Sequence, residues 1–357
     1  MMNNMPFIEV GSRRIGVAES VYVVAEISAN HNQDYEVAAH TIQAAKESGA
    51  DAVKLQTYTP DTMTLPSNSE HFRIGKGTIW EGRNLYDLYR EAYTPWEWQP
   101  KLKAIADDLP IDLFSSPFDP SAVDFLEEMG VPAYKVASFE LIDIPLIERV
   151  ARTGKPLIIS TGMATLAEIE EAVRTVRDAG GTQIALLKCT SAYPAAPDQM
   201  NLRTIPHLAE TFQTPTGLSD HSLGIAVPAA AVALGACIIE KHFTLSRQVP
   251  GPDSGFSLEP HEFKNMVEAI RTVEKALGHT RYGPTDHETH SLAFRRSLFV
   301  VKDIKRGETF TQENIRSIRP AYGLPPKYLK NILGRYATQD LKSGMPLEWK
   351  NVSERER

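Results

Sequence analysis

Two histidines end neighbouring apolar segments of the chain. Residues 219–221 read Ser-Asp-His and residues 240–242 read Glu-Lys-His. Side chains alternate between the faces of a strand, so Ser219 shares a face with His221 and Glu240 shares one with His242. Adjacent strands lie about 4.8 Å apart, so two inward imidazoles near the same end can share one ion. Two histidines with oxygen or water ligands suit Mn²⁺, Mg²⁺ or another borderline cation. The alternative is two ordinary hydrogen-bonded polar residues.

Two lysines lie inside other apolar segments. Lys54 shares a strand face with Gln56, and Lys135 is followed by Ser138 and Glu140. A lysine in a buried strand is costly unless it is paired, which favours an anion-binding role. Small hydroxyl side chains and a glycine just ahead of predicted helices would complete a phosphate site, at Ser115-Ser116, Ser160-Thr161-Gly162 and Thr190-Ser191. Two alternatives stay open, because such hydroxyls are commonly helix caps and either lysine suits a Schiff-base nucleophile.

Two carboxylates accompany these groups. Glu26 closes the first apolar segment, where it can orient a sugar hydroxyl or balance the lysines. Asp253 lies in the stiff turn Pro-Gly-Pro-Asp-Ser at residues 250–254. A structural ion pair is the alternative for Glu26, and a plain turn residue is the alternative for Asp253.

Segments with the composition of buried parallel strands alternate with amphipathic helical patterns over about 280 residues. Eight such strand–helix repeats predict an α/β fold, a (β/α)8 TIM barrel. A doubly wound open sheet is the alternative, although no glycine-rich dinucleotide fingerprint follows the first strand. The predicted strands are Val21–Ser28, Ala52–Tyr58, Asp112–Phe118, Ala133–Ser138, Pro156–Thr161, Ile184–Thr190, Thr216–His221 and Cys237–Thr244.

Two long irregular connections interrupt this rhythm. Thr59–Thr94 is rich in glycine, aromatic and charged residues, and Ser246–Leu258 follows the eighth predicted strand. Both leave the carboxyl ends of strands, the face where barrel active sites lie. Loops of such length are usually functional or disordered, and the aromatic content argues against disorder.

The chain changes character after a last predicted helix, Pro260–Leu277. We expect a barrel domain at residues 1–279, a polar linker at 280–290 and a small β-rich domain at 291–357. The last of these contains short strand and turn patterns and little helical periodicity.

Composition narrows the classes of function. The 357 residues are 42% hydrophobic and 23% charged, ordinary values for a globular protein. No apolar run approaches the roughly 20 residues needed to span a bilayer, and a net charge of −7 gives no support for nucleic-acid binding. Met1–Val10 lacks the order of a secretory signal, so we expect a cytoplasmic location. Cys189 and Cys237 lie in apolar segments and are predicted to be buried, reduced thiols.

Together these motifs resemble the sialic acid synthase family, and the resemblance covers nearly the whole chain. It implies condensation of phosphoenolpyruvate with a 2-acetamido sugar aldehyde, giving a nine-carbon 2-keto sugar acid and phosphate. Ile318-Arg-Pro320 and Gly323-Leu324 resemble the family's C-terminal antifreeze-like (SAF) domain. The matching barrel stretches lie at residues 25–31, 54–56, 114–118, 135–140, 160–163, 217–221, 240–244 and 251–253.

The resemblance implies residue roles as well. His221 and His242 become ligands of a divalent metal ion, Mn²⁺, Mg²⁺ or Co²⁺. The resemblance implies four catalytic residues: Glu26, Lys54, Lys135 and Asp253. Phosphoenolpyruvate is expected to contact Lys54, Ser116, Lys135, Ser138, Ser160, Ser191 and Ser219, and the sugar is expected to contact Gln56, Glu140, Asp253 and Arg319. Ser116 and Ser191 match positions that are often Thr and Asn in members that make N-acetylneuraminate.

The irregular connections resemble one branch of the family. Residues 77–83, 85–89, 93–98 and 253–254 are similar to members that make pseudaminic acid from 2,4-diacetamido-2,4,6-trideoxy-L-altrose. The alternatives are synthesis of N-acetylneuraminate or legionaminic acid, a Schiff-base aldolase, and a non-catalytic carbohydrate-binding or structural protein. The resemblance also implies a homodimer in which the C-terminal domain lies over the partner's active site.

Overall fold

The computed structural model describes residues 5–354. Its contacts divide the chain into two units, Met1–Gly278 and His279–Arg357, and each is described by itself. Part of Met1–Val10, on which the expected location depends, and the last three residues of the predicted C-terminal domain lie outside the described residues.

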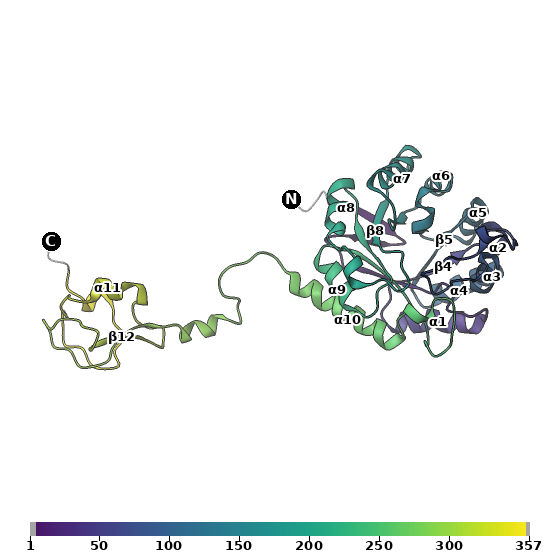
Figure 1. The fold of residues 1–357 in the computed structure, drawn as a ribbon. Helices are drawn as coiled ribbons and strands as arrows, with labels where there is room; N and C mark the ends of the chain where they lie inside the picture. Colours follow the sequence, from purple (N-terminus) through teal and green to yellow (C-terminus); the bar gives the residue numbers. More distant parts are fainter. Residues whose placement is uncertain (1–4, 355–357) are drawn as a thin grey trace. The chain divides into compact units, whose positions relative to one another are not determined.

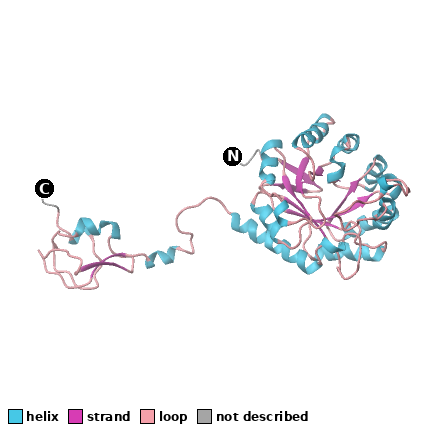
Figure 2. Ribbon diagram, in the orientation of Figure 1, coloured by secondary structure: helices cyan, strands magenta, loops and turns pink. Residues whose placement is uncertain are grey.

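Eight parallel strands form a closed barrel in the first unit (Figures 1 and 2). The strands follow one another in chain order, and pairing of the last with the first closes the ring. Each lies within one predicted segment, so the barrel prediction is confirmed and the doubly wound sheet is wrong. The strands are β3 (Tyr22–Glu26), β4 (Ala52–Thr57), β5 (Asp112–Pro117), β6 (Tyr134–Val136), β7 (Leu157–Ser160), β8 (Ile184–Cys189), β9 (Thr216–Asp220) and β10 (Ile238–His242).

Helices follow the strands and cover the outside of the barrel (Figure 2). Their ends have local causes: Asp34 caps the first of them by accepting from two backbone N–H groups, and Thr165 with Glu168 forms the capping box of α7. The helices are α1 (Tyr35–Glu47), α4 (Gln99–Asp108), α5 (Pro120–Met129), α6 (Ile144–Ala151), α7 (Leu166–Asp178), α8 (Thr204–Phe212), α9 (Ala226–Ala233) and α10 (Pro260–Leu277).

The strands are buried on both faces, as their apolar composition predicts. On β3, Val23 packs in the same cluster as Ile42 of α1, whereas Tyr22 and Val24 belong to a second cluster. Glu26 continues the face of Tyr22 and Val24 at the carboxyl end. This face is therefore apolar at one end and charged at the other.

A two-stranded hairpin precedes the barrel. It consists of β1 (Phe7–Val10) and β2 (Arg13–Gly16), and its buried Ile8 and Ile15 join the cluster that contains Tyr22 and Val24. The Glu9 backbone N–H donates to Gln183 Oε1 at 2.6 Å, just before β8 begins. The hairpin thus packs against the amino end of the barrel and leaves the carboxyl end for a site.

The connection Thr59–Thr94 is more regular than the sequence prediction. It contains α2 (Pro60–Met63), η1 (Glu70–Phe72) and α3 (Leu85–Ala92). Thr59 forms a capping box with Thr62, and Asn84 caps α3, signals that the glycine-rich and charged composition obscured. Aromatic packing joins the segment to the barrel. The Tyr58 ring contacts those of Tyr89 and Phe118, at centroid distances of 5.7 and 5.2 Å.

The second unit is small and β-rich, as expected. Strand β11 (Ser297–Val300) pairs antiparallel with β12 (Ile315–Ile318), and helix α11 (Leu329–Ile332) is short. A separate hydrophobic core includes Leu298, Phe310 and Leu347. Gly323 allows a close chain approach, since a Cβ there would lie 2.2 Å from the Leu298 carbonyl oxygen.

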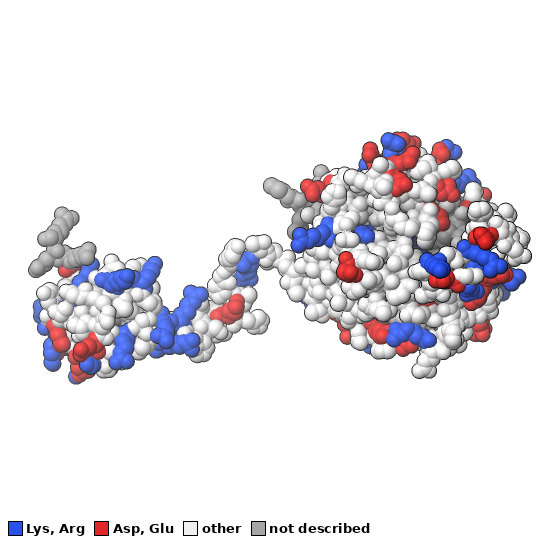
Figure 3. Space-filling model, in the orientation of Figure 1, with Lys and Arg blue, Asp and Glu red and all other residues white. Residues whose placement is uncertain are grey.

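The two units differ in charge. Residues 279–357 hold 15 Lys and Arg against 9 Asp and Glu, whereas residues 1–278 hold 23 against 36. Figure 3 shows Lys and Arg side chains spread over the second unit. Among residues 5–354, every helix is too short or too polar to cross a membrane.

Candidate active site

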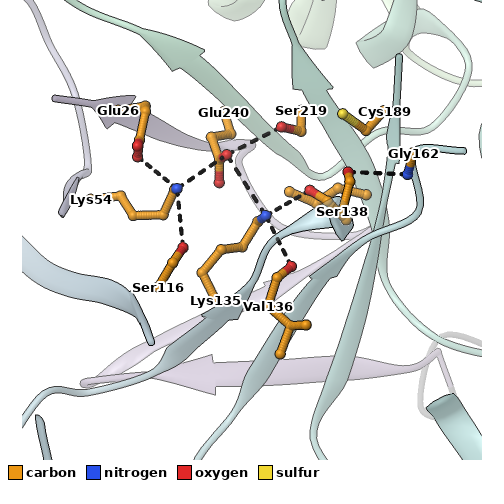
Figure 4. A network of polar contacts seen from close by, with 12 residues as sticks. Glu26, Lys54, Ser116, Lys135, Val136, Ser138, Gly162, Cys189, Ser219 and Glu240 are labelled. Atoms are coloured by element: carbon orange, nitrogen blue, oxygen red, sulfur yellow. Dashed lines mark hydrogen bonds and ion pairs between the residues drawn. The ribbon is translucent and has the colours of Figure 1, made fainter. Parts of the chain in front are cut away.

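Two lysines and two glutamates form a buried network at the carboxyl ends of the strands (Figure 4). Lys54 Nζ lies 2.7 Å from Glu26 Oε2 and 3.6 Å from Glu240 Oε1. Lys135 Nζ lies 3.8 Å from the same Glu240 oxygen. The strand register places Glu26 directly beside Lys54. The barrel therefore brings both predicted lysines to one carboxylate, Glu240.

Burial and charge act differently on the members of this network. Burial opposes the charge of Lys54, but the carboxylates of Glu240 and Glu26 outweigh it and raise the Lys54 pKa. At Lys135 burial dominates and lowers the pKa. Burial also raises the pKa of Glu26 to about 7, against the attraction of Lys54. A bound anion would stabilise the charged form of Lys135, so the site is prepared for an anionic ligand.

Serine hydroxyls surround the two ammonium groups. Lys54 Nζ donates to Ser116 Oγ at 3.3 Å, and Lys135 Nζ donates to Ser160 Oγ at 2.6 Å. Ser219 Oγ donates to Glu240 Oε1 at 3.1 Å. Three of the serines predicted to bind an anion thus lie in direct contact with the network, and Figure 4 labels two of them, Ser116 and Ser219.

Ser138 and Ser191 converge on Gly162. The Gly162 N–H donates to Ser138 Oγ at 3.2 Å. A Cβ on this glycine would lie 2.3 Å from Ser191 Oγ and 2.7 Å from Ser138 Oγ. Only glycine lets all three approach so closely, and a small anion can then meet two hydroxyls at one place.

His221 and His242 come together, as predicted from the strand ends. Their ring centroids are 5.3 Å apart. His221 Nδ1 lies 2.9 Å from the Thr190 carbonyl oxygen, which only accepts, so Nδ1 donates to it and Nε2 is the atom left to meet an ion. Burial opposes the charge of His221, but the neighbouring Cys189 outweighs it and raises the His221 pKa. His242 Nδ1 is buried without a hydrogen-bond partner, and burial, reinforced by His221, lowers the His242 pKa well below its usual value.

These donors fit a divalent cation. An imidazole binds a metal ion through the lone pair of its neutral form, which the lowered pKa of His242 favours. Within residues 5–354, no group of three or more His, Cys, Asp or Glu side chains is arranged to hold an ion. An ion between the two histidines would therefore take further ligands from water or substrate, as expected for two histidines with oxygen ligands.

A hydrogen-bonded chain leads from the network toward Asp253. Gln56 Nε2 donates to Glu26 Oε1 and to Ser28 Oγ, both at 2.9 Å, and Ser28 donates in turn to Asp253. Asp253 Oδ2 lies 3.9 Å from His242 Nδ1. Burial raises the Asp253 pKa. Glu26, predicted to be catalytic, thus lies with Gln56 and Asp253, two of the predicted sugar contacts, beside the histidines.

Glu140 and Arg319, also predicted to contact the sugar, do not belong to this series of hydrogen bonds. Glu140 lies in η3 (Ser138–Ile142), and its Oε2 is buried without a hydrogen-bond partner. Burial raises the Glu140 pKa to about 7, against the attraction of Lys135. Arg319 belongs to the second unit, where it is exposed just beyond β12, and its role stays a prediction.

Aromatic rings pack around the histidine pair. The Tyr193 ring lies 4.3 Å from that of His221 and 5.2 Å from that of Phe256, measured between centroids. Phe256 in turn lies 4.8 Å from His242. Trp80 continues the row at 5.4 Å from Tyr193.

Sequence reasoning missed several of these contributors. Glu240 had a usable signal, because it shares a strand face with His242. Ser28 follows the end of β3 and carries no periodic signal, so its bonds to Gln56 and Asp253 depend on the folded loop. Tyr193 lies in an irregular segment between β8 and α8, where spacing does not indicate direction.

A closed parallel barrel with buried charged side chains at the carboxyl ends of its strands defines a (β/α)8 enzyme. The model of the NeuB family matches residues 41–282, and that of the SAF domain matches residues 295–353. The chain belongs to the NeuB family and carries a SAF domain, which confirms the resemblance found in its motifs.

Individual relatives cover most of the chain. Pseudaminic acid synthase of Helicobacter pylori is 48% identical over 327 residues, which are 91% of this chain and 96% of that protein. N,N'-diacetyllegionaminic acid synthase of Legionella pneumophila is 38% identical over 347 residues, 96% of this chain and 97% of that protein. The solved N-acetylneuraminic acid synthetase of Leptospira borgpetersenii, in complex with citrate, has a TM-score of 0.73 and 32% identity over 82% of this chain and 97% of that chain.

Proposed function

We propose that this chain condenses phosphoenolpyruvate with 2,4-diacetamido-2,4,6-trideoxy-L-altrose to give pseudaminic acid and phosphate. The observation that carries the proposal is the pair of buried lysines with serine hydroxyls at the strand ends. Phosphoenolpyruvate presents two anionic groups, a phosphate and a carboxylate, to such a pair. The choice of sugar is supported by 48% identity to a pseudaminic acid synthase, against 38% to a legionaminic acid synthase.

Binding of phosphoenolpyruvate uses the strand-borne groups. Lys54 and Lys135 hold its phosphate and carboxylate, and the hydroxyls of Ser116, Ser160 and Ser219 turn to donate to its oxygens. Ser138 and Ser191 add two donors beside Gly162. The carboxylate of Glu240 keeps the two ammonium groups close when no anion is bound.

The reaction joins the enol carbon of phosphoenolpyruvate to the aldehyde carbon of the sugar, and the aldehyde oxygen takes up a proton. Water then adds to carbon 2, and the bond to phosphate breaks as the keto acid forms. Burial raises the pKa of Glu26, which suits this carboxyl to exchange a proton with the substrates. Gln56 and Asp253 orient the sugar. When bound at His221 and His242, a divalent ion such as Mn²⁺, Mg²⁺ or Co²⁺ supplies Lewis-acid stabilisation of the developing negative charge.

Product analysis tests this assignment. The enzyme is incubated with phosphoenolpyruvate and a panel of amino sugars, and products are identified by mass and NMR. We expect phosphate release and a nonulosonic acid from the trideoxy altrose, with little or no turnover of N-acetylmannosamine. Equal or better kcat/KM with N-acetylmannosamine would assign the chain to N-acetylneuraminate synthesis, and preference for the 2,4-diacetamido mannose would assign it to legionaminic acid synthesis.

A Schiff-base aldolase is the second candidate, because the lowered pKa of Lys135 is what such a nucleophile needs. The hydrogen bonds of Lys135 Nζ to Ser160 Oγ and to the Val136 carbonyl oxygen instead suit an ammonium donor. Borohydride with pyruvate separates the two candidates. We expect no covalent lysine adduct, and a trapped lysine would favour the aldolase.

We also propose a cytoplasmic homodimer in which residues 291–357, reached through the linker 280–290, cover the partner's barrel mouth. Two observations support this arrangement. The units carry opposite net charges. Connections at the carboxyl ends of the strands expose apolar side chains that a lid would cover: Phe139, Ile142, Met163 and Leu223. Such a lid would exclude water and supply Arg319 to a sugar oxygen.

Mixed dimers test the lid. His242→Ala damages the barrel site and Arg319→Ala damages the lid, and each homodimer should be folded and inactive. If the lid acts on the partner, one site of the heterodimer holds both changes and the other holds none, so co-expression restores activity. If it acts on its own barrel, each site holds one change, and the purified heterodimer stays inactive.

A further inference from the structure

Trp80 links the two irregular connections of the barrel. It lies in Thr59–Thr94, and its indole Nε1 donates to the Pro252 carbonyl oxygen at 3.0 Å. Pro252 immediately precedes Asp253, the carboxylate that accepts from Ser28 and lies beside His242. Trp80 is only partly buried, so part of its ring surface is free to meet a ligand.

The ring of Trp80 also ends a row that begins at the histidines. Tyr193 lies 4.3 Å from His221, and Trp80 lies 5.4 Å from Tyr193, between ring centroids. On the proposed function, the reacting aldehyde carbon of the sugar lies at the histidines. A sugar that extends from there past Asp253 and Tyr193 would bring its far end, carbons 4 to 6, to Trp80.

We propose that Trp80 is a specificity-determining residue that recognises the 4-acetamido group and the 6-methyl group of the sugar. This inference rests on the proposed function and deepens it. The indole face is apolar, and its one N–H donor is used by Pro252. Methyl groups pack well on such a face, whereas the 4- and 6-hydroxyls of N-acetylmannosamine find no partner on it.

Trp96 provides a matched control. Its indole Nε1 donates to the Tyr58 carbonyl oxygen, also at 3.0 Å, and it is partly buried like Trp80. Its ring instead packs on Phe125 of α5, at 4.7 Å between centroids, on the outer side of the barrel. Trp80→Ala and Trp96→Ala therefore remove the same side chain and the same kind of hydrogen bond at different places.

The test measures kcat/KM for the trideoxy altrose and for N-acetylmannosamine in both variants. A hydrophobic contact of this kind discriminates by roughly 10- to 100-fold. We expect Trp80→Ala to lower kcat/KM for the trideoxy sugar by that factor, to change the value for N-acetylmannosamine little, and to leave the KM for phosphoenolpyruvate unchanged. Trp96→Ala should leave the ratio between the two sugars at the wild-type value.

Ligand binding gives a second readout that does not depend on turnover. The alditol of the trideoxy sugar lacks the aldehyde, so it binds without reacting when phosphoenolpyruvate is present. Titration should change tryptophan fluorescence in the wild type and in Trp96→Phe, and the change should be absent in Trp80→Phe.

The outcomes separate this inference from the proposed function. A wild-type enzyme that does not prefer the trideoxy sugar refutes the proposed function before any variant is measured. With a selective wild type, an equal fall for both sugars in Trp80→Ala means that Trp80 only supports the fold, and the inference is wrong. An unchanged fluorescence response in Trp80→Phe contradicts it as well.

Discussion

The lysines and serines of the candidate site lie on or next to barrel strands, whereas its aromatic side chains lie on long connections. Lys54 and Lys135 are positioned by hydrogen-bonded registers that run around the whole barrel. Trp80 is positioned by one side-chain hydrogen bond to a neighbouring connection and by the contact of its ring with Tyr193. Strand positions cannot shift without disturbing the barrel, but connections tolerate change. If the lysines bind the anion and Trp80 contacts the sugar, as proposed, anion binding depends on the scaffold and the choice of sugar depends on connections that can vary independently.

Removal of the metal ion should have the largest effect, because the histidines proposed to hold it lie between the residues proposed to bind phosphoenolpyruvate and those proposed to bind the sugar. We expect a chelator to abolish activity, and Mn²⁺, Mg²⁺ or Co²⁺ to restore it. His221→Ala and His242→Ala should fold, by circular dichroism, but fail to bind the ion in calorimetry. Full turnover of metal-free enzyme in excess chelator would exclude this role of the pair.

Loss of Lys135 should affect the anion side alone. Lys135→Gln removes a buried positive charge that is proposed to stabilise the anionic groups of phosphoenolpyruvate during the reaction. We therefore expect kcat/KM for phosphoenolpyruvate to fall about 100- to 1,000-fold. The affinity for the sugar alditol should change far less. Lys188→Gln is the control, since Lys188 lies on β8, is only partly buried and donates to Thr190 Oγ1 at 3.2 Å. Equal losses in the two variants would contradict a specific role for Lys135.

Substitutions at two glycines test the strand ends and the connections separately. A Cβ at Gly162 would collide with Ser191 and Ser138, so Gly162→Ala should raise the KM for phosphoenolpyruvate by about tenfold or more. A Cβ at Gly255, between β10 and α10, meets no atom within 4 Å. Gly255→Ala should therefore leave both KM values near the wild type. A tolerated Gly162→Ala would show that the close approach of the two serines is not needed.

The smallest expected effect is a dependence of stability on pH at Glu140. Burial raises its folded-state pKa to about 7, so the folded protein binds its proton more tightly than the unfolded chain does. This contribution is fully present below the unfolded pKa of 4.5 and is lost as pH rises through about 7. Glu140→Gln should therefore raise Tm, relative to wild type, by more at pH 8 than at pH 5.

Glu168 gives the opposite sign and serves as the control for Glu140. Hydrogen bonds from Thr165 lower its pKa, so its contribution is present above the unfolded pKa and is lost as pH falls through the folded pKa. Glu168→Gln should lower Tm more at pH 7 than at pH 3. A Tm difference for Glu140→Gln that does not change between pH 5 and pH 8 would mean that Glu140 is not held in a raised-pKa environment.

The sequence predicted the regular strands of the barrel well, and it predicted the irregular connections less well. Continuous apolar runs located the barrel strands, because parallel strands are buried on both faces. Alternation then placed Lys54 on one face with Gln56, and the spacing of adjacent strands placed His221 near His242. The bonds of Ser28 and the direction of Tyr193 depend on irregular backbone, which no periodicity encodes. The helices α2 and α3 were missed because their caps lie within a segment of glycine and charge.

Closure of the barrel has a consequence for how the protein acquires activity. The register across the closing pair of strands sets His242 beside Glu26, residues from opposite ends of the barrel sequence. Contacts between such distant residues carry the largest loop-closure entropy and form slowly. A nascent chain cannot assemble the site before His242 has left the ribosome and β10 has paired with β3. In refolding, activity should consequently return no earlier than the last strand pairing, which makes catalysis a reporter of completed folding.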